Sequence, residues 1–201
     1  MKPNLDISDQ KGNTALHYAV REEDVLSVRQ LCAAGANPTI YNSKGQSTIH
    51  LAAAAADPRI FYALRKASPL VQINFDAPNR EGDSPLHIAV KKQLIRTSGT
   101  LLSASANRHS LDKAGDTPLH IAVKLENLYL TRHLLSIVAM EHRNSVGDTP
   151  IMIAAKQGKG EIFRLLINQS QLIIEDQAEN SLLHLAYTIQ HPHLAFLARA
   201  A

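Results

Sequence analysis

Histidine is the residue type whose recurrence in this sequence most suggests chemistry, because imidazole is both a common metal ligand and a common general base. Five of the ten histidines are the last residue of a recurring four-residue pattern. They are His17, His50, His87, His120 and His184. Packed helices lie roughly 8–10 Å apart, whereas a metal ion holds each nitrogen ligand at about 2 Å. We therefore expect each of these histidines to hydrogen-bond within its own or the next copy, and no two of them to share a metal.

The remaining candidates for reactive chemistry are a second histidine cluster and one thiol. His191 and His193 flank Pro192 and form a cluster with His184, but no further metal ligand accompanies them. Cys32 occupies an apolar helical position, where a buried thiol is the expected state, and no base is placed to activate it. The sequence therefore predicts no catalytic residue, no metal site and no cofactor.

The histidine pattern belongs to a longer unit that recurs along the chain. Its copies start 33, 37, 33, 32 and 32 residues apart. Glycine precedes five copies by two residues, and a second apolar set with helical spacing follows about ten residues later. A period of this length is the signature of a repeat architecture. The six copies are Thr14-Ala15-Leu16-His17, Ser47-Thr48-Ile49-His50, Ser84-Pro85-Leu86-His87, Thr117-Pro118-Leu119-His120, Thr149-Pro150-Ile151-Met152 and Ser181-Leu182-Leu183-His184.

This unit resembles the ankyrin repeat, whose hallmark is a Thr-Pro-Leu-His start on a period of about 33 residues. The resemblance covers roughly residues 8–201, and the first copy, from Asp9 to Asn37, is the fullest match. It implies an all-α solenoid of about six helix-turn-helix repeats with hairpin-like finger loops, in one domain over residues 1–201. The expected repeats are about 9–41, 42–78, 79–111, 112–143, 144–175 and 176–201.

The residues themselves explain why such a unit would form. The Thr or Ser hydroxyl can cap a helix, Pro fits the first helical turn, and an Asp just before the cap favours a helix N-terminus. The glycine two residues before the cap permits a tight turn. One unit cannot bury its own apolar face, so the copies must stack. First helices are predicted to begin near Thr14, Ser47, Ser84, Thr117, Thr149 and Ser181.

Three departures from the pattern carry expectations. Thr97, Ser98 and Gly99 replace apolar residues in the second helix of repeat three, so this helix should be weak. The 37-residue spacing adds about four residues to the finger within 69–78, where Phe75 either contacts a partner or folds onto the stack. The segment 193–201 is apolar at several positions where a terminal repeat is polar. Either residues 187–201 form a degenerate cap or the chain is a piece of a longer protein, and we expect the second.

Basic residues recur at positions that the resemblance places on a concave groove and on the finger tips. Lys91, Lys124 and Lys156 hold the same position in consecutive repeats and are predicted to form a stripe. The stripe is either an ordinary solvated face or a basic groove for an acidic partner. The candidate binding residues are Arg21, Lys91, Lys92, Lys124 and Lys156 in the groove, Lys44, Arg80 and Lys113 on the fingers together with Lys11, and Phe75.

Composition narrows the classes of function. The chain has 201 residues, of which 45% are hydrophobic, enough to bury a core. The net charge of +3 is low for a dedicated nucleic-acid binder, and no apolar run approaches the about 18 residues of a membrane span. One cysteine and the absence of a signal-peptide pattern predict a reducing, cytoplasmic location, or the host cytosol for a delivered bacterial effector.

The function favoured by these observations is protein binding through the groove and the finger loops, by a monomer that is not an enzyme. Two alternatives remain open at this point. The chain could recruit substrates or host targets for a larger enzyme or a bacterial effector. Nucleic-acid binding through the lysines is the weaker alternative, because no aromatic residues alternate with the charges.

Overall fold

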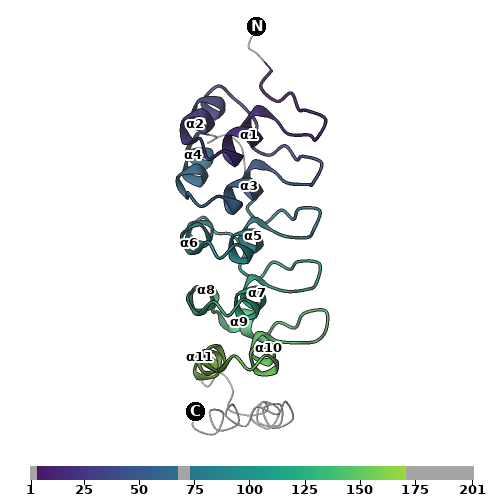
Figure 1. Cartoon of the computed structure of the whole chain (residues 1–201), viewed down its shortest axis with the longest axis vertical. Helices are drawn as coiled ribbons and strands as arrows, with labels where there is room; N and C mark the ends of the chain where they lie inside the picture. Colours follow the sequence, from purple (N-terminus) through teal and green to yellow (C-terminus); the bar gives the residue numbers. More distant parts are fainter. Residues whose placement is uncertain (1–3, 68–72, 171–201) are drawn as a thin grey trace. The chain divides into compact units, whose positions relative to one another are not determined.

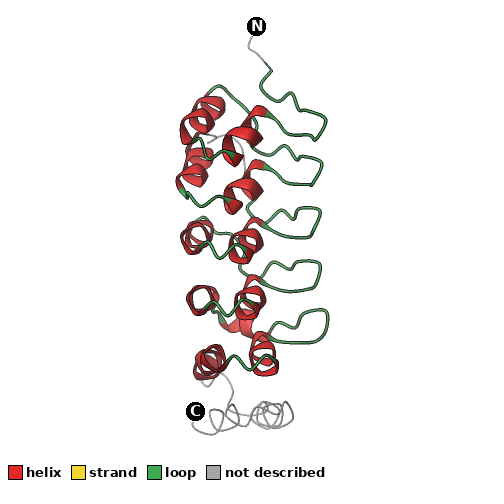
Figure 2. Cartoon of the chain, viewed as in Figure 1, coloured by secondary structure: helices red, strands yellow, loops and turns green. Residues whose placement is uncertain are grey.

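The computed structural model describes residues 4–67 and 73–170, and every regular element in these ranges is a helix. Figure 2 shows short helices joined by loops, with long loops projecting from the start of each repeat. The helices are α1 (Ala15–Arg21), α2 (Val25–Ala33), α3 (Thr48–Ala54), α4 (Arg59–Ala67), α5 (Pro85–Lys91), α6 (Ile95–Ser103), α7 (Pro118–Lys124), α8 (Leu128–Leu134), α9 (Ile137–Glu141), α10 (Pro150–Lys156) and α11 (Gly160–Ser170).

The chain divides into two compact units, residues 1–113 and 114–201. In the first unit, α1, α3 and α5 stack in one layer (Figure 1). The helices α2 and α4 pack on each other in a second layer, and α6 packs on α5 on the same side as these two. In the second unit, α7 packs on α10 and α8 on α11 (Figure 1). The predicted helix-turn-helix repeats are therefore confirmed within each unit, whereas a single domain over 1–201 stays a prediction.

The first helix of each described repeat begins at the predicted residue. The N-caps are Thr14, Ser47, Ser84, Thr117 and Thr149. In the last three repeats the cap hydroxyl accepts the backbone N–H three residues on, and Pro occupies the first helical turn. The sixth predicted start, Ser181, lies outside the described residues.

In four of the described fingers, one Asp or Asn side chain organises a tight turn. In the second finger, Asn42 Oδ1 accepts the N–H groups of Lys44 and Gln46 at 2.9 and 3.0 Å. Gly45 completes the turn with a φ of +67°, and a Cβ there would lie 2.9 Å from the backbone nitrogen of Arg80 in the next finger. The predicted role of the finger glycine is confirmed. Asp9, Asn79 and Asn144 accept equivalent pairs of N–H groups in their own fingers.

The cores of both units consist of the recurring apolar residues. Phe61 and Leu64 of α4 are buried in the core of the first unit, and Phe163 and Leu166 of α11 are buried in that of the second. Burial of each such side chain stabilises the fold by about 1.5–3 kcal/mol relative to exposure. Other fully buried side chains are Leu16, Ile49, Ile60, Leu86, Leu101, Leu119, Leu130, Leu134 and Ile162.

The second helix of repeat three, α6, carries the polar residues that the sequence indicated. Thr97 and Ser98 are buried at 1% exposure each. The Thr97 hydroxyl donates to the carbonyl of Ala55 at 3.2 Å, whereas the Ser98 hydroxyl is buried without a hydrogen-bond partner. Gly99 lies in the middle of the helix, and a Cβ added to it would meet no neighbouring atom within 4 Å.

Replacing Gly99 with alanine is expected to raise the free energy of unfolding by about 0.5–1 kcal/mol, because alanine loses less backbone entropy on entering a helix. Urea unfolding of Gly99→Ala beside the unaltered chain would measure the change. Gly45→Ala is the matched control and should be destabilised, because it combines positive φ with backbone contact. Destabilisation by Gly99→Ala would show that α6 does not tolerate a side chain there.

Repeat four differs from the predicted two-helix unit. Its second helix, α8, ends at Leu134, and a separate five-residue helix, α9, follows. Ser136 separates the two helices with an extended backbone, and its hydroxyl accepts the N–H of Ala139 at 3.2 Å to cap α9. A Gly-Ala-Asn turn such as Gly35-Ala36-Asn37 is missing here, and a serine cap takes over the end of the repeat.

Candidate protein-binding surface

The repeat histidines hold the fingers onto the first helices. His50 Nδ1 accepts the backbone N–H of Ser47 at 3.2 Å, and its Nε2 lies 2.8 Å from the carbonyl oxygen of Ala77. Because Nδ1 accepts, the proton must be on Nε2, and the imidazole is neutral. The same Nδ1 bond forms at His17, His87 and His120, and Nε2 reaches the carbonyls of Gln46 from His17 and Asp148 from His120.

Burial keeps these imidazoles neutral. Desolvation lowers the pKa of His17, His50 and His120 below the usual value of 6.5, although hydrogen bonds to backbone carbonyls partly oppose the shift. The expected structural role of the histidines is therefore confirmed for His17, His50 and His120. His184, like His191 and His193, lies outside the described residues.

Other reactive groups are not gathered into a site in the described part of the chain. No three His, Cys, Asp or Glu side chains there are placed to hold one metal ion. Cys32 is buried at 4% exposure in α2. None of the helices within 4–67 and 73–170 has the length and apolar character needed to cross a bilayer.

Each lysine of the predicted stripe is paired with an aspartate of its own repeat. Lys91 Nζ lies 2.5 Å from Asp83 Oδ1 and 3.5 Å from Asp112 Oδ2. Lys124 pairs in the same way with Asp116, and Lys156 with Asp148. In every case the aspartate is the residue just before the N-cap, eight residues before the lysine. The stripe is thus largely neutralised from within.

Lys91 of repeat three lies near two carboxylates. Partial burial of the ammonium group would by itself lower the pKa of Lys91, but the hydrogen bond and charge of Asp83, with the charge of Asp112, outweigh it and raise that pKa. Asp83 is only 2% exposed, so removing Lys91 would leave a nearly buried carboxylate uncompensated.

Repeats one and two lack this pairing. The position before the N-cap holds Asn13 and Gln46 instead of aspartate. Arg21 occupies the lysine position of repeat one, where its guanidinium lies 4.8 Å from the centre of the Tyr18 ring and 3.7 Å from Glu22. Both partners of this last ion pair are mostly exposed, and such pairs contribute little.

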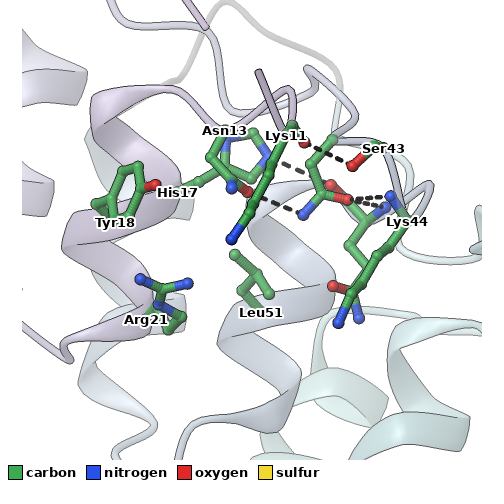
Figure 3. A pocket seen from close by; sticks show the side chains of 10 residues that line it. Lys11, Asn13, His17, Tyr18, Arg21, Ser43, Lys44 and Leu51 are labelled. Carbon is green, nitrogen blue, oxygen red and sulfur yellow. Dashed lines mark hydrogen bonds between the residues drawn. The ribbon is translucent and has the colours of Figure 1, made fainter. Parts of the chain in front are cut away.

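A pocket of about 270 Å³ lies between the first two fingers and the helices behind them. Figure 3 shows Lys11 and Lys44 extending from the two fingers, Arg21 of α1 below the Tyr18 ring, and Leu51 of α3 at the base. Its polar lining includes the amides of Asn13 and Gln46, and no carboxylate lines it. The pocket therefore gathers three cations in one concavity.

The other predicted binding residues are exposed, except Phe75. Lys92 follows the end of α5, and Arg80 and Lys113 lie on finger tips. Phe75 is half-buried, and its ring packs against that of Phe61 with 5.4 Å between centroids. This contact favours the alternative in which Phe75 folds onto the stack. The neighbouring residues 68–72 of the longer finger lie outside the description.

Replacing Phe75 with alanine is expected to lower the free energy of unfolding by about 1–2 kcal/mol, less than for a fully buried Phe because the ring is half exposed. Thermal unfolding followed by circular dichroism would detect it. Tyr62→Ala, which truncates an aromatic on the same helix as Phe61 that is 55% exposed, should change stability little. If Phe75→Ala leaves stability unaltered and weakens partner capture, the partner-contact alternative is correct.

A second hollow of about 600 Å³ lies on the opposite helix layer, between α2 and α4. Val25, Ala33 and Ala63 line it, with Arg29 and Arg59 among the polar residues. It is wider and more apolar than the finger pocket, and it gathers fewer charged groups.

Sequence reasoning missed the carboxylates that pair with the lysines. Asp83, Asp116 and Asp148 were expected only to favour helix N-termini, yet their spacing of eight residues from a lysine recurs in three repeats and could have indicated the pairs. The finger-organising residues Asp9, Asn42, Asn79 and Asn144 recur three residues before the finger glycine and give a comparable signal.

Comparisons with known proteins agree with this geometry. The family model described as "Ankyrin repeats (3 copies)" matches residues 49–137, and the model described as "Ankyrin repeat" matches residues 11–43 and 146–176. NF-kappa-B inhibitor delta of Mus musculus is 36% identical over 90 residues, covering 45% of this chain and 27% of that protein. B-cell lymphoma 3 protein of Homo sapiens is 33% identical over 108 residues, covering 54% of this chain and 24% of that protein.

The fold is also similar to a solved structure, that of the ankyrin repeat domain of Bcl-3, described as a unique member of the IkappaB protein family. The TM-score is 0.78 at 29% identity, over 82% of this chain and 73% of that one. The chain spans about a quarter of the length of the curated relatives named above. With the capped first helices, the histidine bridges and the fingers, these matches show that the chain belongs to the ankyrin repeat family.

Proposed function

We propose that this domain, a protein-interaction module by its family, binds its partner through the finger face. This name denotes the surface made by the finger tips and the C-terminal ends of the first helices. The observation that carries the proposal is the pocket in which Lys11 and Lys44 of two fingers meet Arg21 of α1. The other members of the face in the first unit are Arg80, Lys113, Lys91 and Lys92, and the corresponding face of the second unit carries Lys124 and Lys156, all of them exposed.

Binding is favoured over catalysis because the polar side chains that recur at equivalent positions of the repeats have structural partners. The described repeat histidines are held by backbone groups, and the lysines of three repeats are paired with aspartates. The exposed finger tips, in contrast, are rigidly placed by the turns beneath them. Rigid, exposed, charged loops suit recognition of another protein.

The proposal concerns this domain rather than a whole protein, since the curated relatives are longer. Recruitment of targets for a larger enzyme or for a bacterial effector would use the same surface. We place nucleic-acid binding behind protein binding, because aspartates neutralise three lysines of the stripe. We also propose that the domain is a monomer and that it lies in a reducing intracellular compartment. The buried thiol of Cys32 supports the reducing compartment.

The test is comparative affinity capture from cell lysate with three versions of the domain. The first is unaltered, the second carries Lys44→Ala and Arg80→Ala on the finger face, and the third carries Arg29→Ala and Arg132→Ala on the exposed surface of α2 and α8. Because one relative is named as an inhibitor of NF-kappa-B, capture of NF-kappa-B is measured as one defined readout of the experiment. We expect a protein retained by the first and third versions and lost by the second. Loss by the third version alone would place recognition on the outer helices.

A further inference from the structure

The distribution of paired and unpaired charge differs along the repeats at two equivalent positions. Where repeats three, four and five have an aspartate before the cap and a lysine eight residues later, repeat one has Asn13 and Arg21. Repeat two has Gln46 and Ala54. The neutral amides cannot compensate a cation, so Arg21 keeps a charge that its counterparts share with aspartate. In repeat one, the only carboxylate paired with Arg21 among the described residues is therefore the exposed one of Glu22.

Two lysines bring further positive charge to the same place. Ser43 of the second finger donates to the carbonyl oxygen of Lys11 through its backbone N–H at 2.9 Å and its hydroxyl at 2.8 Å. Asn42 Nδ2 donates to Asn13 Oδ1 at 3.0 Å. These bonds fix the first two finger tips side by side, and among the described residues neither Lys11 nor Lys44 has an ion-pair partner.

The carboxylate of Asp9 in the first finger is already bound by other groups of the chain. Asp9 Oδ2 accepts the Tyr18 hydroxyl at 2.7 Å, and Asp9 Oδ1 accepts the N–H groups of Lys11 and Asn13 at 2.9 and 2.7 Å. Asp9 therefore serves the finger turn, and it does not line the pocket. Glu22 contacts Arg21 only at 3.7 Å with both side chains mostly exposed, so it can yield to a better partner.

We propose, on the basis of the protein-binding function above, that this pocket receives an anionic side chain from an extended segment of the partner, either a carboxylate or a phosphorylated residue. Lys11, Lys44 and Arg21 provide its positive charge, and Asn13 and Gln46 add polar amide groups. Arginine can bind either anion through two parallel N–H groups. Charge recognition by the domain is thereby assigned to repeats one and two.

The size and the charge of the pocket determine the class of occupant. A volume of about 270 Å³ lies just below the usual range for small-molecule sites of about 300–1,000 Å³, and it accommodates a side chain rather than a folded element. The paired lysines of repeats three to five would have to release their own aspartates to bind the same group. An anion therefore gains more at Lys11 and Lys44, which have no ion-pair partner among the described residues, and at Arg21, whose pair with Glu22 is exposed.

The proposal can be tested with three labelled octapeptides that share Gly-Ser ends and carry four central glutamates, phosphoserines or glutamines. Titration into the ¹⁵N-labelled domain should shift the amide signals of Lys11, Asn13 and Lys44 with the first two peptides and leave them in place with the glutamine peptide. Lys44→Glu should weaken binding of the anionic peptides by about tenfold or more. Arg132→Glu, an equal charge change on the exposed surface of α8, should retain it within about twofold.

Binding of both anionic peptides supports a pocket for acidic side chains in general, and binding of the phosphoserine peptide alone supports a phosphorylated ligand. Equal loss in Lys44→Glu and Arg132→Glu, equal binding of the glutamine peptide, or no binding of either anionic peptide would overturn the proposal. Should Lys44→Glu fail to fold by circular dichroism, Lys11→Gln removes a pocket charge without adding a carboxylate. The proposed function fails separately: a protein lost by the Lys44→Ala and Arg80→Ala version in lysate capture would support the finger face even if no anionic peptide bound the pocket.

Discussion

Replacing His50 with methionine is expected to lower the free energy of unfolding by about 2–4 kcal/mol, since each buried polar group left unpaired costs about 1–3 kcal/mol. His50 has no exposed surface, and it bridges the N–H of Ser47 to the carbonyl of Ala77. Methionine is of similar size but cannot make either bond well. It is also the residue that repeat five carries at this position, as Met152.

Urea unfolding followed by circular dichroism measures this change, and His133→Met is its control. His133 is an exposed residue of α8, and the same chemical replacement there should alter stability by less than about 0.5 kcal/mol. The His50 variant should also loosen the segment around Ala77, which precedes the finger that begins at Asn79. Equal effects of the two replacements would show that the imidazole bridge contributes no stability.

The ends and caps of the first helices could be predicted from sequence because their causes are local. A hydroxyl at Ser84 or Thr117, followed by Pro, fixes the start of a helix within four residues. The repeated glycine likewise fixes the finger turn. Neither feature depends on contacts with distant parts of the chain.

The charge pattern of the candidate site could not be read so directly, because it depends on which side chains meet in space. The sequence places Lys91, Lys124 and Lys156 in register, but only the coordinates show that Asp83, Asp116 and Asp148 meet them. The pocket between the fingers arises in the same way, from Lys11, Arg21 and Lys44 on three separate segments.

The short helix α9 was missed for a third reason. The two-helix repeat predicted for about 112–143 has no place for a third helix, and α9 begins after Ser136, directly beyond α8. A single serine can either cap a new helix or continue the previous one, and packing against α10 and α11 accompanies the first outcome.

Acidification below about pH 6.5 is expected to destabilise the domain well before its carboxylates are protonated. Burial lowers the pKa of His17, His50 and His120 in the folded state. The unfolded chain therefore binds more protons, and stability rises with pH. Their contribution is complete above the unfolded pKa of about 6.5, and it is lost as pH falls from that value through the lower folded pKa. Each unit of difference in pKa is worth about 1.4 kcal/mol per histidine.

The pH range in which the histidines take up protons is separate from the range in which these carboxylates do. Asp9, Asp24 and Asp57 have pKa values lowered below 3.8, chiefly by side-chain hydrogen bonds to Tyr18, Ser27 and Arg59 respectively. Their contributions are therefore lost only at still lower pH. Nearby charges modulate the histidines, since Asp83 favours protonation of His50, while at His120 Asp116 favours it and Lys124 opposes it.

Thermal unfolding midpoints of the unaltered chain and of His50→Met, measured at pH 7.5, 6.5, 5.5 and 4.5 in buffers of equal ionic strength, would test this expectation. The midpoint of the unaltered chain should fall steadily below pH 6.5. The variant should begin lower and fall less steeply, because it has one buried imidazole fewer to protonate. The two curves should therefore converge toward acid pH, where His50 no longer stabilises the fold. Parallel curves would mean that protonation of His50 does not contribute to acid unfolding, and that other groups set the pH dependence of the fold.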